Sequence, residues 1–392
     1  MNRDCTFFAC LILAVVSLLV PAPARGGDDD LKIVHINIGQ GDATLILGPR
    51  QADGTRVSVL VDAGNIPLGG GKDGGKIVLE ALGKCGVEIL DFFVVTHYDA
   101  DHIGGAIAGS DSMHGLAFLL GPDNAPGSSG DDDGDGDADW LDDPPTKMIT
   151  PDPEELGTGD DIRVMKFVDR GDTGAPTTQA FKKYKGMAEA KPNARVTITT
   201  QGDVNSFAID LKGGATMTCL AANGFVRDRS AKVAKVNTEN EKSLCFLLRL
   251  GGFDYLIGGD TIGREFGREN AHVEAAIGEY LRAEAVNVDV LHVNHHGANN
   301  ASDDEFLEAV AAEVAIISVG NGNSHEHPSD EALARLADAG VYRIIQTEWG
   351  TTQGVIPESV RGRQAIYQGD IVLTTDGVSY DISTSRSFGV DE

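Results

Sequence analysis

The chain has 392 residues, and 60 acidic side chains against 32 basic ones give it a formal net charge of −28 at pH 7. A surface this acidic repels extended polyanions, so the composition argues against nucleic-acid binding through a broad basic surface.

The first 24 residues have the order of a secretory signal peptide. A basic start is followed by an apolar run over residues 7–20 and by small residues that suit cleavage before Arg25. The run is shorter than the roughly 20 residues that a membrane-spanning helix needs, although a retained N-terminal anchor is the alternative. We therefore expect residues 25–30 to be a linker and the mature chain to be secreted or periplasmic, with no membrane span.

Three cysteines remain after this cleavage, Cys85, Cys219 and Cys245. In an oxidising compartment one disulfide can form among them, and the sequence does not say which cysteine is left over.

From residue 31 the chain alternates between short strand-like runs and helical periodicity. Strands are expected at 32–38, 43–47, 57–61 and 91–96, with a helix at 77–82. Between about 110 and 205 the content of Gly, Asp, Pro and Lys rises and the apolar periodicity fades, which predicts a long insertion.

After the insertion the periodicity returns. Strands are expected at 207–211, 216–221, 244–250, 255–257, 288–293, 314–319, 342–347 and 371–375, and helices at 271–284, 303–311 and 330–339. This order predicts an α+β chain with two sheets and outer helices in one layered domain over 31–385, followed by a tail at 386–392.

The strongest chemical pattern is the run Thr96-His97-Tyr98-Asp99-Ala100-Asp101-His102, directly after an apolar strand. Two carboxylates and two imidazoles crowded into six positions are costly without a cation, because like charges oppose each other's ionisation. The run therefore indicates a metal site rather than a polar surface turn.

This run resembles the metal-binding motif of the metallo-β-lactamase superfamily, in the His-x-Asp-x-Asp-His form of the ComEC-type competence proteins. Further pieces of the same pattern follow in the same order: Gly39-Gln40-Gly41-Asp42-Ala43, Leu60-Val61-Asp62-Ala63-Gly64, Ile257-Gly258-Gly259-Asp260, His295-His296-Gly297 and His327-Pro328. The resemblance implies a four-layer αββα sandwich with a long Asp/Gly-rich insertion, and a metal-dependent hydrolase.

The resemblance also implies a set of ligands. His97 and Asp99 would face one metal, and Asp101, His102 and one histidine of the 295–296 pair would face the other. We prefer His295 as that ligand, with His296 contacting a ligand or the substrate. Asp260 would bridge both metals.

Around these ligands, Asp62 is expected to orient a ligand and Asp42 to shape the pocket. In the superfamily, the metal that His97 and Asp99 would face here usually has a further histidine ligand, which lies before the strand that leads to Asp260. This chain has no histidine in that region. Asn240 and Ser243 in that region match the ComEC-type pattern. An oxygen-rich first site favours manganese, whereas imidazole ligands suit zinc. The sequence therefore predicts one or two divalent ions and leaves open whether they are zinc or manganese.

A metal lowers the pKa of a bound water to about 7, and paired metals stabilise the attacking and leaving oxygens of an in-line displacement. We predict Asp101 and His327 as catalytic residues. His327 would protonate the leaving oxygen or hold a non-bridging one; the alternative is a capping or solvent histidine before the helix that starts at Asp330.

The insertion contains a second pattern, with Asp131, Asp133, Asp135 and Asp142 at positions one, three, five and twelve of a calcium loop. Asp-rich linkers produce this spacing easily, so calcium binding and a solvated loop are equally consistent with it.

These patterns predict an exported metal-dependent phosphodiesterase or nuclease-like enzyme. The substrate would be a small molecule or a phosphodiester, with nucleic acid disfavoured by the acidic charge. Two alternatives stay open: a hydrolase of the same fold that acts on an amide, lactone or thioester, and a non-catalytic calcium-dependent binding protein.

Overall fold

A computed structural model describes residues 27, 30–65, 74–106, 163–190, 193–263, 272–351 and 357–385. The predicted signal peptide, the predicted calcium loop at Asp131, Asp133, Asp135 and Asp142, and the tail lie outside these residues.

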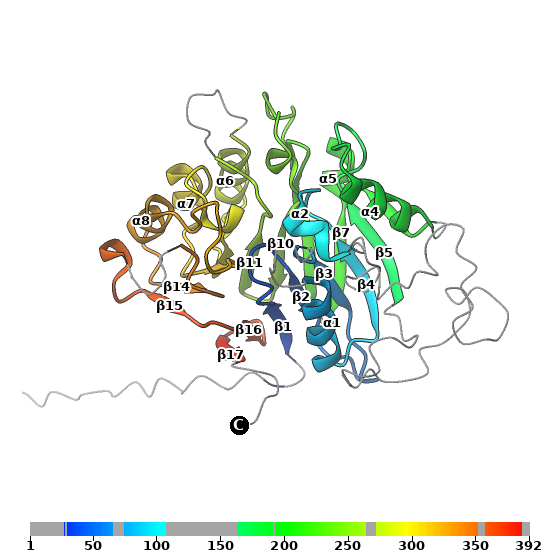
Figure 1. Cartoon of the computed structure of the whole chain (residues 1–392), viewed down its shortest axis with the longest axis horizontal. Helices are drawn as coiled ribbons and strands as arrows, with labels where there is room; N and C mark the ends of the chain where they lie inside the picture. Colours follow the sequence, from blue (N-terminus) through cyan, green and yellow to red (C-terminus); the bar gives the residue numbers. More distant parts are fainter. Residues whose placement is uncertain are drawn as a thin grey trace, which may run out of the picture.

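Two mixed sheets form the centre of the molecule (Figure 1). The first has the order β17-β16-β1-β2-β3-β4-β5-β6, which are respectively Tyr380–Ser385, Asp370–Thr375, Leu31–His35, Thr44–Leu47, Ser58–Val61, Ile89–Val94, Arg163–Asp169 and Arg195–Thr197. The second has the order β15-β14-β13-β12-β11-β10-β8-β7, which are Gln364–Ile366, Arg343–Gln346, Val314–Ile317, Val290–His292, Phe253–Ile257, Cys245–Leu250, Ala215–Ala222 and Ala208–Lys212; β9, Phe225–Val226, pairs with β8.

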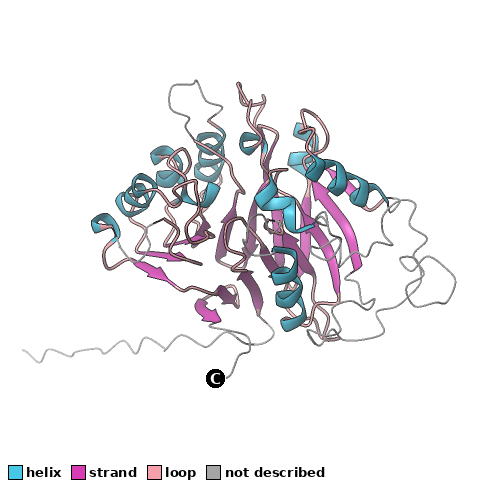
Figure 2. Ribbon diagram, in the orientation of Figure 1, coloured by secondary structure: helices cyan, strands magenta, loops and turns pink. Residues whose placement is uncertain are grey.

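Helices cover the outer faces of both sheets (Figure 2). The helices are α1 (Gly74–Lys84), α2 (Ala100–Ile103), α4 (Gln179–Ala190), α5 (Gln201–Ser206), α6 (Val273–Ala283), α7 (Asp304–Val310) and α8 (Asp330–Asp338). One apolar core joins α1 and α4 to the first sheet, another joins α6, α7 and α8 to the second, and a third lies between the sheets. The predicted α+β sandwich of four layers is therefore confirmed.

Burial explains why the strands differ in pattern. The edge strand β7 alternates between exposed and buried side chains, as a strand with one solvated face does, whereas the central strand β11 is buried at all of its positions. At the start of α8 the Ser329 hydroxyl accepts the backbone N–H of Ala332, which caps the helix.

The C-terminal part of the predicted insertion contains regular secondary structure. Residues 163–206 contain β5, α4, β6 and α5, and β5 runs parallel to β4 with Phe93 opposite Phe167. The many charged residues of this stretch masked these elements. Strands β9, β15 and β17 were also not predicted.

In the described part of the chain, no helix combines the length and the apolar character needed to cross a membrane. Cys85, Cys219 and Cys245 are free thiols.

Candidate metal centre

The run from His97 to His102 forms a loop at the end of β4 and the short helix α2. His97 and His102 are fully buried, and their rings lie 4.2 Å apart between centroids. The glycine turn before Asp42 packs against this loop: a Cβ on Gly41, whose φ is +118°, would lie 2.3 Å from the carbonyl oxygen of Asp101. Only glycine allows that approach.

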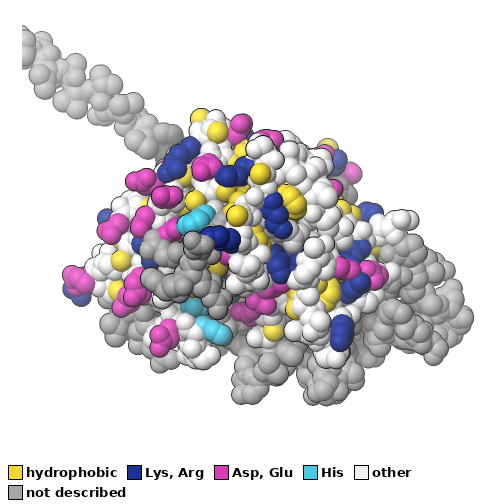
Figure 3. Space-filling view, turned by 90° about the horizontal axis from the view of Figure 1, so that it is seen from above, with side chains coloured by type: hydrophobic (Ala, Val, Ile, Leu, Met, Phe, Trp, Pro, Cys, Tyr) yellow, Lys and Arg dark blue, Asp and Glu magenta, His cyan; other side chains and the backbone are white. Residues whose placement is uncertain are grey.

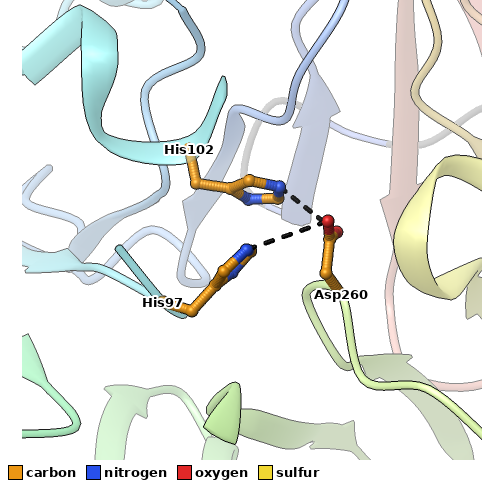
Figure 4. A group of neighbouring side chains, drawn as sticks. All are labelled: His97, His102 and Asp260. Atoms are coloured by element: carbon orange, nitrogen blue, oxygen red, sulfur yellow. Dashed lines mark ion pairs between the residues drawn. The ribbon is translucent and has the colours of Figure 1, made fainter. Parts of the chain in front are cut away.

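Asp260 reaches the same point from the second sheet. It follows β11, and its carboxylate faces both imidazoles (Figure 4). Its Oδ1 is 3.2 Å from Nε2 of His102, and its Oδ2 is 3.8 Å from Nε2 of His97. The three side chains place their ligand atoms within 4.8 Å of one another, a spacing that suits a bound metal ion.

The two adjacent histidines follow β12 and approach Asp260 from different sides. Nε2 of His296 is 3.5 Å from Oδ2 of Asp101 and 3.7 Å from Oδ1 of Asp260. Nε2 of His295 is 3.7 Å from the other oxygen of Asp260. The structure thus groups His296, and not the preferred His295, with Asp101 and His102.

The imidazole rings are fixed by hydrogen bonds on their outer nitrogens. Nδ1 of His102 donates to Asp62 at 2.7 Å, and Nδ1 of His296 donates to the carbonyl oxygen of Ser318 at 2.9 Å. Nδ1 of His97 lies 3.1 Å from the hydroxyl oxygen of Thr96. That hydroxyl gives its hydrogen to Asp62, so its oxygen accepts the hydrogen bond from Nδ1 of His97.

The inner nitrogens make no hydrogen bond. Nε2 of His97, His102 and His296 and Oδ1 of Asp260 are all buried without a hydrogen bond. Such groups are costly to bury unless something binds them. The imidazole nitrogens and carboxylate oxygens of the two overlapping groups, His97 with His102 and Asp260, and Asp101 with His102 and His296, are donors that zinc and related divalent ions take, so these residues fit metal binding.

Asp62 holds the first-sheet side of this arrangement in place. Besides the His102 ring, it accepts the backbone N–H of Thr96 at 2.8 Å and the Thr96 hydroxyl at 2.6 Å. Its contact with Nδ1 of His102 fixes the tautomer that leaves the lone pair on Nε2.

The buried carboxylates of the cluster favour positive charge on the groups beside them. Burial alone would lower the pKa of His102, but Asp260 and Asp62 outweigh burial and hold that pKa well above its usual value. Burial likewise opposes ionisation of Asp260, yet the neighbouring His102, His296 and His295 keep the pKa of its carboxyl well below its usual range. Protons or a bound cation can supply this positive charge.

The other predicted neighbours lie next to the cluster. Asn240 places Nδ2 3.1 Å from Nε2 of His295, and Ser243 accepts the backbone N–H of Asp260 at 3.3 Å. Asp99 places Oδ2 3.6 Å from Nε2 of His97. Asp42 contacts the buried His292 at 3.1 Å, and burial raises the pKa of Asp42 to about 7.

His327 lies beside the two histidines on a loop with a fixed backbone. Its ring centroid is 5.3 Å from that of His295. Asn323 donates to its carbonyl oxygen and accepts its N–H, and the N–H of Thr351 donates to the same oxygen. Burial, followed by the nearby His295 and His296, lowers the pKa of His327 to about 3.

A pocket of about 560 Å³ opens next to His327. It is lined by Asn299, His325, Glu326, His327, Pro328, Ser329, Asp330, Glu331, Thr351 and Pro357. Acidic side chains also lie near the exposed histidines on the face of the molecule seen in Figure 3. The pocket therefore has carboxylates and imidazoles but no lysine or arginine among its described lining residues.

Two buried charged residues that support the site were missed by the sequence analysis. Arg170, fully buried, pairs with both oxygens of Glu239 at 2.7 Å, and Glu239 also accepts the N–H of Tyr98, between His97 and Asp99. The stretch 164–168 before Arg170, apolar except for Lys166, was the available signal for a buried strand.

Glu274 in α6 supports the loop of the adjacent histidines. It accepts Nδ2 of Asn294 at 2.7 Å and the backbone N–H groups of Ser302 and Asp303 at 2.8 and 2.9 Å. Its place on a helical face with apolar neighbours gave no sign of this role.

Two curated proteins are similar to the chain in sequence. ComE operon protein 3 of Bacillus subtilis (strain 168) is 22% identical over 353 residues, which cover 88% of this chain and 34% of that protein. Competence protein ComA of Neisseria gonorrhoeae is 29% identical over 110 residues, which cover 28% of this chain and 14% of that protein. The chain resembles the ComEC-type competence proteins. This ComEC-like chain spans about a third of the first relative's length and less of the second.

Solved structures with similarity to the ComEC-like chain include metallo-β-lactamase fold proteins. YhfI from Bacillus subtilis has a TM-score of 0.37 and 10% identity, covering 82% of this chain and 98% of that one. Tm1679, a metal-dependent hydrolase of the β-lactamase superfamily, has a TM-score of 0.38 and 12% identity, covering 81% and 95%. No family model matches the chain.

Proposed function

We propose that the chain is an exported, metal-dependent phosphodiesterase. The observation that carries this proposal is the convergence of buried, unpartnered imidazole nitrogens of His97, His102 and His296 on Asp260, with Asp99 and Asp101 beside them. A divalent ion bound to these side chains, zinc or manganese, would lower the pKa of a water molecule and supply a nucleophile near neutral pH.

The side chains around that ion have separate tasks. Asp62 and the Ser318 carbonyl keep His102 and His296 in the tautomer that presents Nε2. Asp101, whose carboxylate contacts His296, would accept a proton from the attacking water. His327 has a depressed pKa and is neutral at pH 7, so a hydrogen bond to a non-bridging oxygen suits it better than proton donation.

The pocket beside His327 supports a small phosphodiester over a nucleic acid strand. Glu326, Asp330 and Glu331 line it, and they would repel the next phosphate of a polynucleotide. A neutral or cationic leaving group avoids that repulsion.

The test is hydrolysis of bis(p-nitrophenyl) phosphate by the full chain with added zinc or manganese. We expect turnover that chelation abolishes and that falls at least about 100-fold in Asp260→Asn, because the shared carboxylate is lost. Asp210→Asn, at an exposed aspartate of β7, is the matched control and should keep full activity. Absence of turnover on this ester together with hydrolysis of nitrocefin or a thioester would overturn the proposal.

Export is proposed from the N-terminal sequence. Mass spectrometry of the protein from the culture medium or periplasm should find Arg25 as the first residue; a cell-associated chain that still starts at Met1 would contradict export.

A further inference from the structure

We infer that the chain divides its two adjacent histidines between two metal positions, with His296 completing one and His295 completing the other. The second position would consist of Asp101, His102 and His296. The first would consist of His97, Asp99 and His295, which takes the place of the missing third histidine. The inference rests on the metal binding in the proposed function.

The two oxygens of Asp260 show this division. Oδ1 faces His102 at 3.2 Å and His296 at 3.7 Å. Oδ2 faces His97 at 3.8 Å and His295 at 3.7 Å. Each oxygen therefore meets one imidazole from the first sheet and one from the second, which is the pattern expected of a carboxylate that bridges two ions.

The ring of His295 is oriented in the same way as those of the other three histidines. Its Nδ1 lies 3.0 Å from Oδ1 of Asn300, an acceptor, so Nδ1 carries the proton and Nε2 carries the lone pair. That lone pair accepts a hydrogen bond from Nδ2 of Asn240 at 3.1 Å and lies 3.7 Å from Oδ2 of Asp260, so an ion bound there would replace the Asn240 contact. An imidazole held through its outer nitrogen is the usual arrangement of a metal ligand.

The backbone around the pair is built to turn both rings toward Asp260. His295 and His296 have φ values of +51° and +53°, in the left-handed region that residues other than glycine rarely adopt. The N–H of His295 donates to the carbonyl oxygen of Gly259, next to Asp260, at 3.0 Å. Strained conformations at two successive residues persist where the surroundings impose them, and they concentrate at functional sites.

The experiment counts bound metal rather than turnover. The purified full chain and its variants would be dialysed against buffered Zn²⁺, and bound zinc per chain would be measured by atomic emission. We expect His295→Ala and His296→Ala each to bind one ion fewer than the unmodified chain. His325→Ala, at an exposed histidine on the rim of the pocket, is the matched control and should bind as many ions as the unmodified chain.

A second variant guards against loss of the fold. Asn300→Ala keeps His295 but removes the acceptor of its Nδ1, and should weaken the first position about 10- to 100-fold without changing the number of ions at saturation. Circular dichroism would verify that each variant is folded.

The outcomes separate the two proposals. An unmodified chain that binds no zinc overturns the proposed function. An unmodified chain that binds zinc, while His295→Ala keeps the same number of ions with unchanged affinity, overturns only the inference about His295. The aspartates at 131–142 are present in all of these proteins, so any ion bound there cancels in the comparison.

Discussion

Arg170 offers the sharpest test of how the metal centre is supported. Its guanidinium is fully buried, lies 4.4 Å from the centre of the Tyr98 ring, and also donates to Oδ1 of Asn223 and to the carbonyl oxygen of Thr173. Arg170→Met keeps most of the side-chain volume but leaves Glu239 without its cation.

Removing one partner of a buried ion pair costs about 3–5 kcal/mol, because the other charge stays desolvated and unpaired. We therefore expect the free energy of unfolding of Arg170→Met to fall by about that amount, with a decrease in Tm on the order of 10 °C. Urea unfolding followed by circular dichroism would measure it. The double variant Arg170→Met, Glu239→Gln has no unpaired charge and should recover part of the loss.

Arg249 provides the control for this prediction. It makes a similar two-bond contact with Asp254, but its side chain is 47% exposed. Exposed pairs contribute about 1 kcal/mol or less, so Arg249→Met should change stability little. Equal losses for Arg170→Met and Arg249→Met would refute the argument that burial of the pair sets its importance.

Three further predictions concern the ligand support, the backbone and the thiols. Asp62→Asn should weaken zinc affinity about 10- to 100-fold in a calorimetric titration, because His102 loses its anionic partner; unchanged affinity would contradict the role of Asp62. Gly297→Ala should lower the free energy of unfolding in urea by about 1–3 kcal/mol, since the φ of Gly297 is +76° and the new Cβ would lie 2.8 Å from Pro328. Gly340→Ala, whose Cβ would have nothing within 4 Å, should lower it less. Equal losses of stability would exclude the contact with Pro328 as the cause. Burial raises the pKa of Cys219 to about 12, so iodoacetamide at pH 8 should leave it unmodified in the folded protein and alkylate it in urea; labelling of the native protein would show that the thiol is accessible.

The sequence predicted the parts of the site that depend on local pattern. His97, His102 and Asp260 each follow a strong apolar strand, and strand ends deliver side chains to the edge where two sheets meet. Their spacing along the chain was sufficient to expect that these residues meet, and the structure brings them together.

The pair at 295 and 296 could not be resolved in this way. Both histidines follow the same strand, and what distinguishes them is the direction that two left-handed backbone conformations give to each ring. Such conformations depend on packing around the loop, including the approach of Gly297 to Pro328.

The contribution of Arg170 was hidden for another reason. Its partner Glu239 lies 69 positions away along the chain, so no local pattern marks the pair. Charged residues also made the stretch around Arg170 look like a solvated insertion, although Asp169 and Arg170 are buried and paired with Arg195 and Glu239. Composition reports charge but not whether a charge is paired.

The candidate ligands come from both halves of the sandwich, with His97 and His102 after β4 of the first sheet and Asp260 after β11 of the second. An ion held by both halves would bind only when they are docked, so occupancy would stabilise the folded chain by about 2.7 kcal/mol at a free-metal concentration one hundred times Kd. For the proposed exported chain, resistance to proteases would then rise and fall with the supply of trace metal in its surroundings.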